Sequence, residues 1–122
     1  MAVPIIEALA CGIKHELYAV NVPNKGSIPG IDDDVVVEVP AIADGKEIFP
    51  QKMERLPQAI TVMIRVQGSI QKLVVEAYVE KSLRKLLQAI LLEPTVNSYR
   101  NAVALINEMC KLQKDVLPHM EW

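Results

Sequence analysis

The 122-residue sequence is poor in cysteine and in aromatic side chains. Its two cysteines, Cys11 and Cys110, lie far apart, which is typical of reduced thiols in a cytosolic protein and not of a disulfide scaffold. Aromatic residues make up 4% of the chain and are scattered along it. A free-standing carbohydrate-binding module needs an aromatic platform for the face of a sugar, so the sequence argues against such a module.

Charge and hydropathy argue against two further kinds of partner. The 13 Lys and Arg residues form no stripe and the formal net charge is −2, so we expect no nucleic-acid partner. No apolar run approaches the roughly 20 residues that cross a bilayer. The first residues lack the basic region of a secretory signal, so we expect a cytoplasmic protein with no membrane partner.

The sequence also lacks the common catalytic motifs. It contains no G-x-G-x-x-G, P-loop or G-x-S-x-G pattern. The carboxylates of Asp32 and its two acidic neighbours resemble a cation cluster, but consecutive side chains on an extended loop diverge, which favours a solvated turn. Cys11 and His15 are spaced for one face of a helix, yet Gly12 lies between them, which favours a buried structural cysteine and a surface histidine. We therefore predict no catalytic, cofactor-binding or metal-binding residue in this chain.

What the sequence does contain is a high proportion of apolar residues. They make up 51% of the chain, and the mean hydropathy is +0.20. The length predicts a single domain over residues 1–122, which would bury about two-thirds of its unfolded surface. Two interpretations remain open: a helical domain with a large core, or a piece that covers another domain or subunit.

The first half of the chain predicts one helix and three strands. The helix ends at Gly12, a common C-terminal stop. Pro40 lacks an N–H group, so it predicts that the second strand lies at a sheet edge or ends there. Asp44-Gly45 predicts a tight turn before the third strand. The predicted elements span residues 3–11, 15–22, 35–41 and 47–49.

The second half predicts three helices. The first follows Pro57 and carries apolar residues with a 3.6-residue period. Ser82 is predicted to cap the second helix, which Pro94 ends, and Asn97 or Ser98 to cap the third, which continues to Pro118. Short connections favour antiparallel neighbours. The predicted fold class is α+β and mainly helical, with antiparallel helices and a small β element.

Residues 21–40, NVPNKGSIPGIDDDVVVEVP, are the most informative stretch. Gly, Pro and Asn each fix backbone conformations that other residues resist, so this loop is predicted to have a defined shape. Asn24-Lys25-Gly26 forms either a nest of N–H groups for an anion or a tight turn with Gly26 at positive φ, and the turn is favoured. Glu38 alternates with valines, which places it on the solvent face of a strand unless another domain covers that face.

Several blocks in order resemble the C-terminal region of the family-four glycoside hydrolases, of the α-galactosidase and 6-phospho-glucosidase type. Departures occur at Val79-Glu80, where the family has Gly-Asp, and at Gly30-Ile31, where a Leu-Pro pair is missing. The matching blocks are VPIIEALAC at residues 3–11, NVPNKGSIP at 21–29, the acidic pair at 33–34, VVEVP at 36–40, QKLVVEA at 71–77 and QAILLEP at 88–94.

The resemblance implies glycoside cleavage by oxidation and elimination, with NAD and a divalent metal such as manganese in the complete enzyme. The Rossmann half, the metal-binding Cys and His and the acid/base segment precede this region in the family. Cys11 does not lie in the sequence context of the family's metal-binding cysteine. This chain alone would therefore bind neither cofactor and is expected to be inactive. Whether it counts as an enzyme is therefore left open.

Two roles follow from the resemblance. In the first, the chain is the C-terminal subdomain of such a glycosidase, providing part of the substrate-domain scaffold and an interface for a homo-oligomer or a Rossmann-containing partner half. Asn21, Asn24 and Gly26 would then shape the loop near the glycoside pocket. In the second, it is a stand-alone interaction or oligomerisation module that retains the fold. An autonomous hydrolase that uses the acidic loop is the least favoured alternative.

Overall fold

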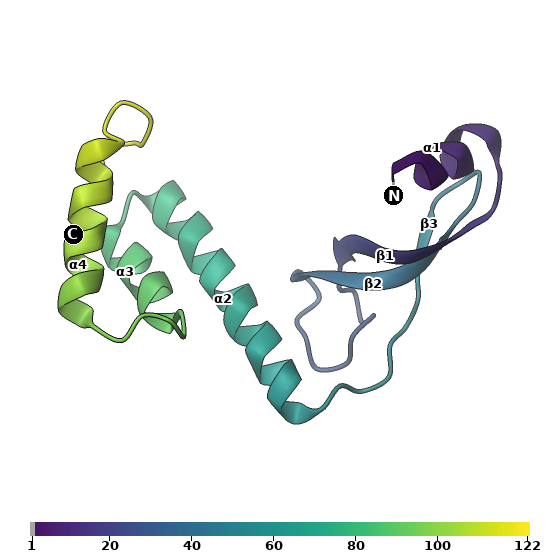
Figure 1. The fold of residues 1–122 in the computed structure, drawn as a ribbon, viewed down its shortest axis with the longest axis horizontal. Coiled ribbons are helices and arrows are strands. Elements are labelled where there is room, and N and C mark those ends of the chain that lie inside the picture. Colours follow the sequence, from purple (N-terminus) through teal and green to yellow (C-terminus); the bar gives the residue numbers. More distant parts are fainter. Residues whose placement is uncertain (1) are drawn as a thin grey trace. The chain divides into compact units, whose positions relative to one another are not determined.

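The computed structural model describes residues 2–122, which form two compact units, residues 2–62 and 63–122. Four helices and a small antiparallel sheet confirm the predicted α+β, mainly helical class (Figure 1). That the two units make up a single domain stays a prediction. The elements are α1 Ala2–Cys11, β1 His15–Pro23, β2 Val36–Ala43, β3 Ile48–Pro50, α2 Gln58–Glu80, α3 Leu83–Leu92 and α4 Tyr99–Leu112.

The three strands pair in the order β1-β2-β3, so β2 is the central strand. The prediction that Pro40 marks an edge or an end is wrong, because β2 continues to Ala43. Leu17 pairs with Ala41 and Val20 with Val39, which leaves Pro40 opposite a bulge in β1. The carbonyl of Pro40 accepts from the N–H of Gln51 at 2.8 Å, and the N–H and C=O of a strand residue point to the same side. The missing N–H therefore faces the β3 side just beyond Pro50, where the pairing of β2 with β3 has ended, and is tolerated there.

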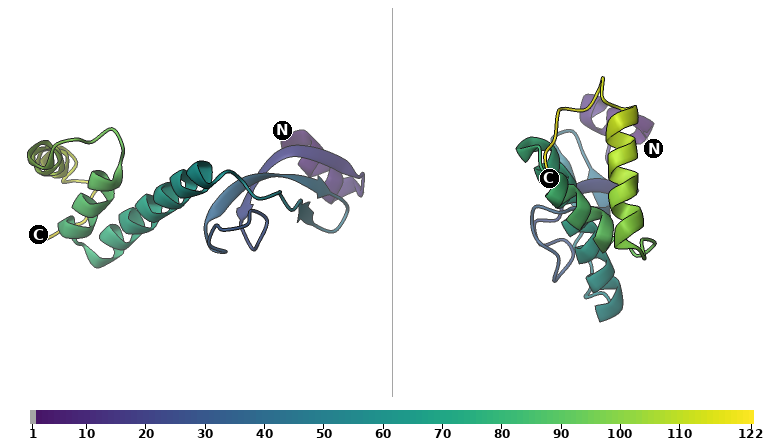
Figure 2. Two further views of the ribbon diagram at one scale, coloured as in Figure 1. Left: turned by 90° about the horizontal axis from the view of Figure 1, so that it is seen from below. Right: turned by 90° about the vertical axis from the view of Figure 1, so that its left-hand side faces the viewer.

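The core of the first unit lies between α1 and one face of the sheet (Figure 1 and Figure 2). Gly12 has φ +70° and its N–H bonds the carbonyl of Ala8 at 3.0 Å, which ends α1 as predicted. A Cβ at Gly45 would lie 2.8 Å from the Cα of Gly12, so these two turns approach as closely as glycine permits. The buried residues of this core are Ala8, Leu17, Val20, Ala41 and Ala43.

In the second unit, α3 and α4 run in opposite directions and pack against each other (Figure 1). Ser82 caps α3 through the N–H of Lys85, and Ser98 caps α4, so both cap predictions hold. The prediction that this last helix continues to Pro118 is wrong, because α4 ends at Leu112 and a turn follows. The buried residues of this core are Leu83, Leu87, Ala102 and Ile106. Within residues 2–122, no helix is both long and apolar enough to cross a membrane.

Candidate functional site

Asn24 organises the loop between β1 and β2 from the inside. The residue is 0% exposed. Its Oδ1 accepts a hydrogen bond from the N–H of Ile28 at 2.7 Å. Its Nδ2 donates to the carbonyls of Ile28 at 3.1 Å and Ile31 at 2.8 Å. The side chain is fully engaged by the protein, so it shapes the loop and is not exposed to a ligand.

The backbone after Asn24 makes a tight turn. Lys25 has φ +42° and Gly26 has φ +81°. The N–H of Ser27 bonds the carbonyl of Asn24 at 2.7 Å, and that of Lys25 bonds the carbonyl of Asp33 at 3.2 Å. A Cβ added at Gly26 would meet nothing within 4 Å, so the conformation and not the available space favours glycine. The geometry matches the tight turn favoured from the sequence.

Asn21 occupies a different position from the other two predicted site residues. It lies on β1 directly opposite Glu38 of β2, and both residues are exposed. Directly opposed side chains of an antiparallel pair share one face of the sheet. They contribute to the wall of a hollow of about 390 Å³, to which Ile5 and Ile48 also contribute. An amide beside a carboxylate offers both donors and acceptors, the chemistry that binds the hydroxyl groups of a sugar.

The acidic triplet forms a turn, as the sequence indicated. Residues 32–34 are exposed and precede β2. The carbonyls of Asp32 and Asp33 accept hydrogen bonds from the N–H groups of Val35 and Lys25, both at 3.2 Å. In the part of the chain that the structure describes, no three His, Cys, Asp or Glu side chains come close enough to hold a metal ion. These residues therefore do not fit a metal centre.

Cys11 and His15 have the reverse of the expected exposure. Cys11 is exposed, whereas His15 is half-buried. Gly12 ends α1 between them, so they do not share a helical face. The Nε2 atom of His15 is buried and lies 3.2 Å from Oε2 of Glu7, but it makes no hydrogen bond. The interaction is a contact between α1 and β1.

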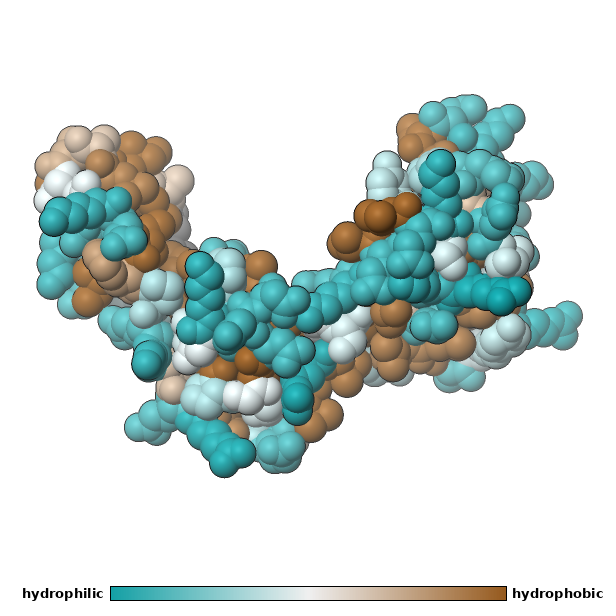
Figure 3. Space-filling model, turned by 180° about the vertical axis from the view of Figure 1, so that it is seen from behind, coloured by the Kyte–Doolittle hydropathy of each residue, from teal (hydrophilic) through white to brown (hydrophobic). Residues whose placement is uncertain are grey.

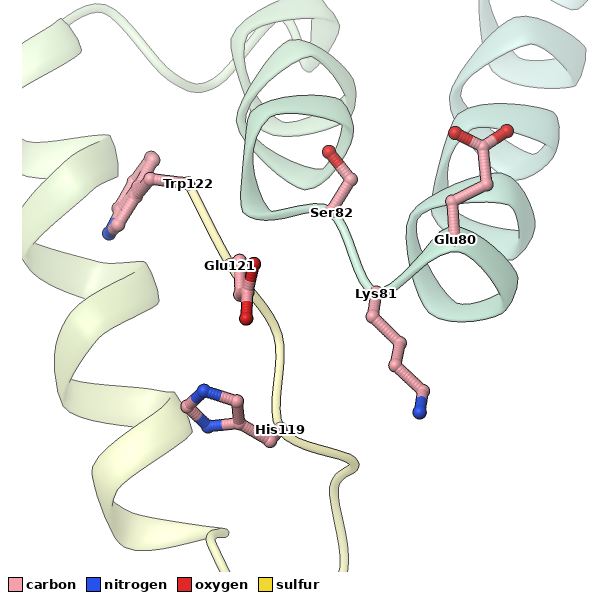
Figure 4. A pocket seen from close by; sticks show the side chains of 6 residues that line it. All are labelled: Glu80, Lys81, Ser82, His119, Glu121 and Trp122. Carbon is pink, nitrogen blue, oxygen red and sulfur yellow. The ribbon is translucent and has the colours of Figure 1, made fainter.

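A second hollow, in the second unit, was not foreseen from the sequence. It has a volume of about 480 Å³ and is lined by the end of α2, the following turn and the C-terminal tail (Figure 4). The tail is held by two backbone hydrogen bonds, from Leu83 N–H to the carbonyl of Glu121 at 2.7 Å and from Glu121 N–H to that of Lys81 at 2.8 Å. The side chain of Lys81 points away from the tail (Figure 4). No local sequence signal predicts this pairing.

Close to this hollow, a lysine connects α2 to α3. Nζ of Lys85 donates to carboxylate oxygens of Glu76 and Glu80, the latter at 2.7 Å. These two hydrogen bonds raise the pKa of Lys85 above its ordinary value, and the bond to Glu76 has the larger effect. Both glutamates are exposed and Lys85 is half-buried, so salt partly screens their attraction.

The chain is similar to known proteins over nearly its whole length. The sequence model described as "Family 4 glycosyl hydrolase C-terminal domain" matches residues 1–96. A maltose-6'-phosphate glucosidase from Clostridium acetobutylicum is 40% identical over 106 residues, which is 87% of this chain and 24% of that protein. A second, from Bacillus subtilis, is 35% identical over 100 residues, which is 82% of this chain and 22% of that protein. The chain thus spans about a quarter of the length of these relatives.

The fold has a close match among solved structures. A 6-phospho-alpha-glucosidase from gut microorganisms, in complex with NAD and glucose-6-phosphate, superposes with a TM-score of 0.87 at 28% identity. The match covers 96% of this chain and 26% of that one. Together with the sequence match, this establishes that the chain belongs to family 4 of the glycosyl hydrolases, whose C-terminal domain its residues 1–96 match.

Proposed function

We propose that the chain is the C-terminal subdomain of an NAD- and metal-dependent glycosidase. The observation that carries this proposal is that one contiguous quarter of the relatives accounts for nearly all of this chain. The fold would complete the substrate domain, and its helices would contribute to assembly in a cytoplasmic enzyme. NAD and manganese would be held by the other three quarters, since no group among residues 2–122 fits a metal.

The proposed substrate of the complete enzyme is a 6-phosphorylated α-glucoside. Two relatives are named maltose-6'-phosphate glucosidase, and the solved relative contains glucose-6-phosphate. In this chain the exposed Asn21 and Glu38 would face the substrate side of the sheet. Asn24 and Gly26 would act indirectly, by fixing the loop that continues from Pro23, the last residue of β1.

Thermal unfolding can test whether NAD and manganese bind to the other three quarters of the enzyme and not to this chain. The chain is heated alone, and then with the N-terminal three quarters of the Clostridium acetobutylicum relative, each with and without NAD and manganese. Ligand at 100 times its dissociation constant stabilises the state that binds it by about 2.7 kcal/mol. We expect NAD and manganese to leave the melting temperature of the chain alone unchanged. They should raise the melting temperature of the mixture by more than the sum of their effects on the two separate pieces. A saturable shift of the chain alone would contradict the proposal.

The residue roles call for a separate comparison. In the reconstituted mixture, Asn21→Ala and Glu38→Gln should raise the KM for a 6-phospho-α-glucoside while leaving chain folding unchanged. Val36→Ala, on the same exposed face of β2, is the matched control. Unchanged KM in both site variants would remove Asn21 and Glu38 from the substrate side.

The alternative is an interaction module that retains the fold without the enzyme. The exposed apolar residues of both units favour it as a second candidate, because they suit protein partners as well as a catalytic half (Figure 3). An adjacent reading frame that encodes a Rossmann half would support the glycosidase. Its absence, together with failure of the reconstitution, would support the module.

A further inference from the structure

The bend between α2 and α3 contains no helix-breaking residue. Only Lys81 and Ser82 separate the two helices. Residues 69–93 contain neither glycine nor proline, the two residues that most often end a helix. Lysine itself is a good helix former. The sequence therefore permits one continuous helix over residues 58–92, and contacts from elsewhere in the fold must impose the bend.

The bend holds Lys81 in a backbone conformation that lysine resists. Its φ is +55°, in the left-handed region, where glycine is the usual residue at the end of a helix. The N–H of Ser82 bonds the carbonyl of Ala77, five residues back, at 2.9 Å, so the last turn of α2 closes around Lys81. Backbone strain of this kind persists only where the surrounding structure holds it.

The tail, residues 119–122, supplies such contacts through the backbone of Glu121 (Figure 4). Its N–H bonds the carbonyl of the strained Lys81 at 2.8 Å, and its carbonyl accepts from the N–H of Leu83, the first residue of α3, at 2.7 Å. The hydrogen bond that the α3 cap residue itself accepts is longer, at 3.4 Å. Met120 packs beside the α3–α4 core. The tail therefore bonds to both sides of the bend.

A side-chain contact favours the same bend. Nζ of Lys85, in the first turn of α3, donates to a carboxylate oxygen of Glu76 on α2. The two residues are nine positions apart, and a continuous helix would place them about 14 Å apart along its axis and on opposite sides. This hydrogen bond can therefore form only when the chain is bent.

We propose that the tail is a clasp that holds a hinge at Lys81 and Ser82. While the clasp is closed, α2 and α3 are separate helices. When it opens, the strain at Lys81 relaxes as this residue takes a helical φ, and α2 and α3 join into one helix over residues 58–92. The α3–α4 hairpin then moves with α3 to a new position relative to α2. The clasp lies outside residues 1–96, which the family model matches, and the inference does not depend on the proposed function.

Glu121→Pro tests the clasp, because proline lacks the N–H that bonds Lys81. Glu121→Ala is the matched control, since it keeps both backbone hydrogen bonds. Spin labels at Val75 of α2 and Leu92 of α3, both exposed, report the bend by double electron–electron resonance. The two native cysteines are first replaced by alanine, so that only the introduced cysteines react. A continuous helix separates the two labelled Cα atoms by about 26 Å, and a bent chain holds them closer.

The clasp predicts one short distance in the parent chain and in Glu121→Ala. Glu121→Pro should add a second, narrow population at about 26 Å. Adding Lys81→Gly to the proline variant should lower the ratio of long to short distances at least about fivefold, because glycine takes a positive φ without strain and weakens a continuous helix. Adding Glu76→Gln instead should raise that ratio, because it removes the contact that only the bent chain can make.

Two results would overturn the proposal. If Glu121→Pro keeps the single short distance of the parent chain, the tail does not hold the hinge. If Glu121→Pro gives a broad distribution together with a loss of helical circular dichroism, α3 unfolds when the tail is released and does not join α2.

Discussion

Replacing Asn24 by alanine should destabilise the first unit by a predictable amount. The substitution leaves the N–H of Ile28 and the carbonyl of Ile31 without their side-chain partner in a buried loop. The carbonyl of Ile28 keeps a weaker bond from the N–H of Ile31 at 3.4 Å. Each unpaired buried group costs about 1–3 kcal/mol, so the two together should lower the free energy of unfolding by about 2–6 kcal/mol.

The assay must report on the correct unit. The single tryptophan, Trp122, lies in the second unit, so its fluorescence is the wrong probe. Denaturant unfolding followed by far-UV circular dichroism, with hydrogen exchange at the Ile28 amide, reports on the loop itself. Asn21→Ala is the matched control, because this exposed asparagine should change stability by less than about 0.5 kcal/mol. A similarly small effect of Asn24→Ala would refute the reasoning.

Three further predictions concern the backbone, the α3–α4 core and the surface charges. Gly26→Ala should lose about 1 kcal/mol, because φ +81° is strained for a residue with a Cβ; denaturant midpoints check this, and an unchanged midpoint would refute it. Ile106→Ala should lose about 2–5 kcal/mol from the α3–α4 core, seen as a lower melting temperature by circular dichroism, with exposed Leu105→Ala as its control. The raised pKa of Lys85 contributes stability that is present below the unfolded value of about 10.4 and is lost as the pH rises through the folded value. Melting temperatures above about pH 10.4 should therefore fall less steeply in a Glu76→Gln, Glu80→Gln double variant or in high salt, and equal slopes would contradict the ion pairing.

Features set by local chemistry were predictable from the sequence. Ser82 and Ser98 cap helices because a side-chain oxygen satisfies an N–H of the first turn. Gly12 ends α1 because it adopts a positive φ. At Asp44, Oδ1 accepts from the N–H of Lys46 at 2.9 Å and closes the predicted turn before β3. Each of these signals acts within four residues and needs no knowledge of the tertiary fold.

Features set by distant partners were not predictable in this way. Pro40 is tolerated in the central strand because its missing N–H faces the β3 side just beyond Pro50, where β3 ends. Asn24 was grouped with Asn21 as a site residue, but the fold buries Asn24 and leaves Asn21 exposed. Whether these residues act in substrate binding stays a prediction. The pairing of Glu121 with the turn after α2 joins positions about 40 residues apart, beyond the range of turn and capping rules.

Hydrolysis by a reconstituted enzyme tests the central claim most directly. The N-terminal three quarters of the Clostridium acetobutylicum relative is titrated with this chain, and release of product from a 6-phospho-α-glucoside is measured with NAD and manganese present. We predict no hydrolysis by either piece alone and a saturable rise in rate as the chain is added. Hydrolysis by the chain alone, or a complex of the two pieces that remains inactive, would contradict the account.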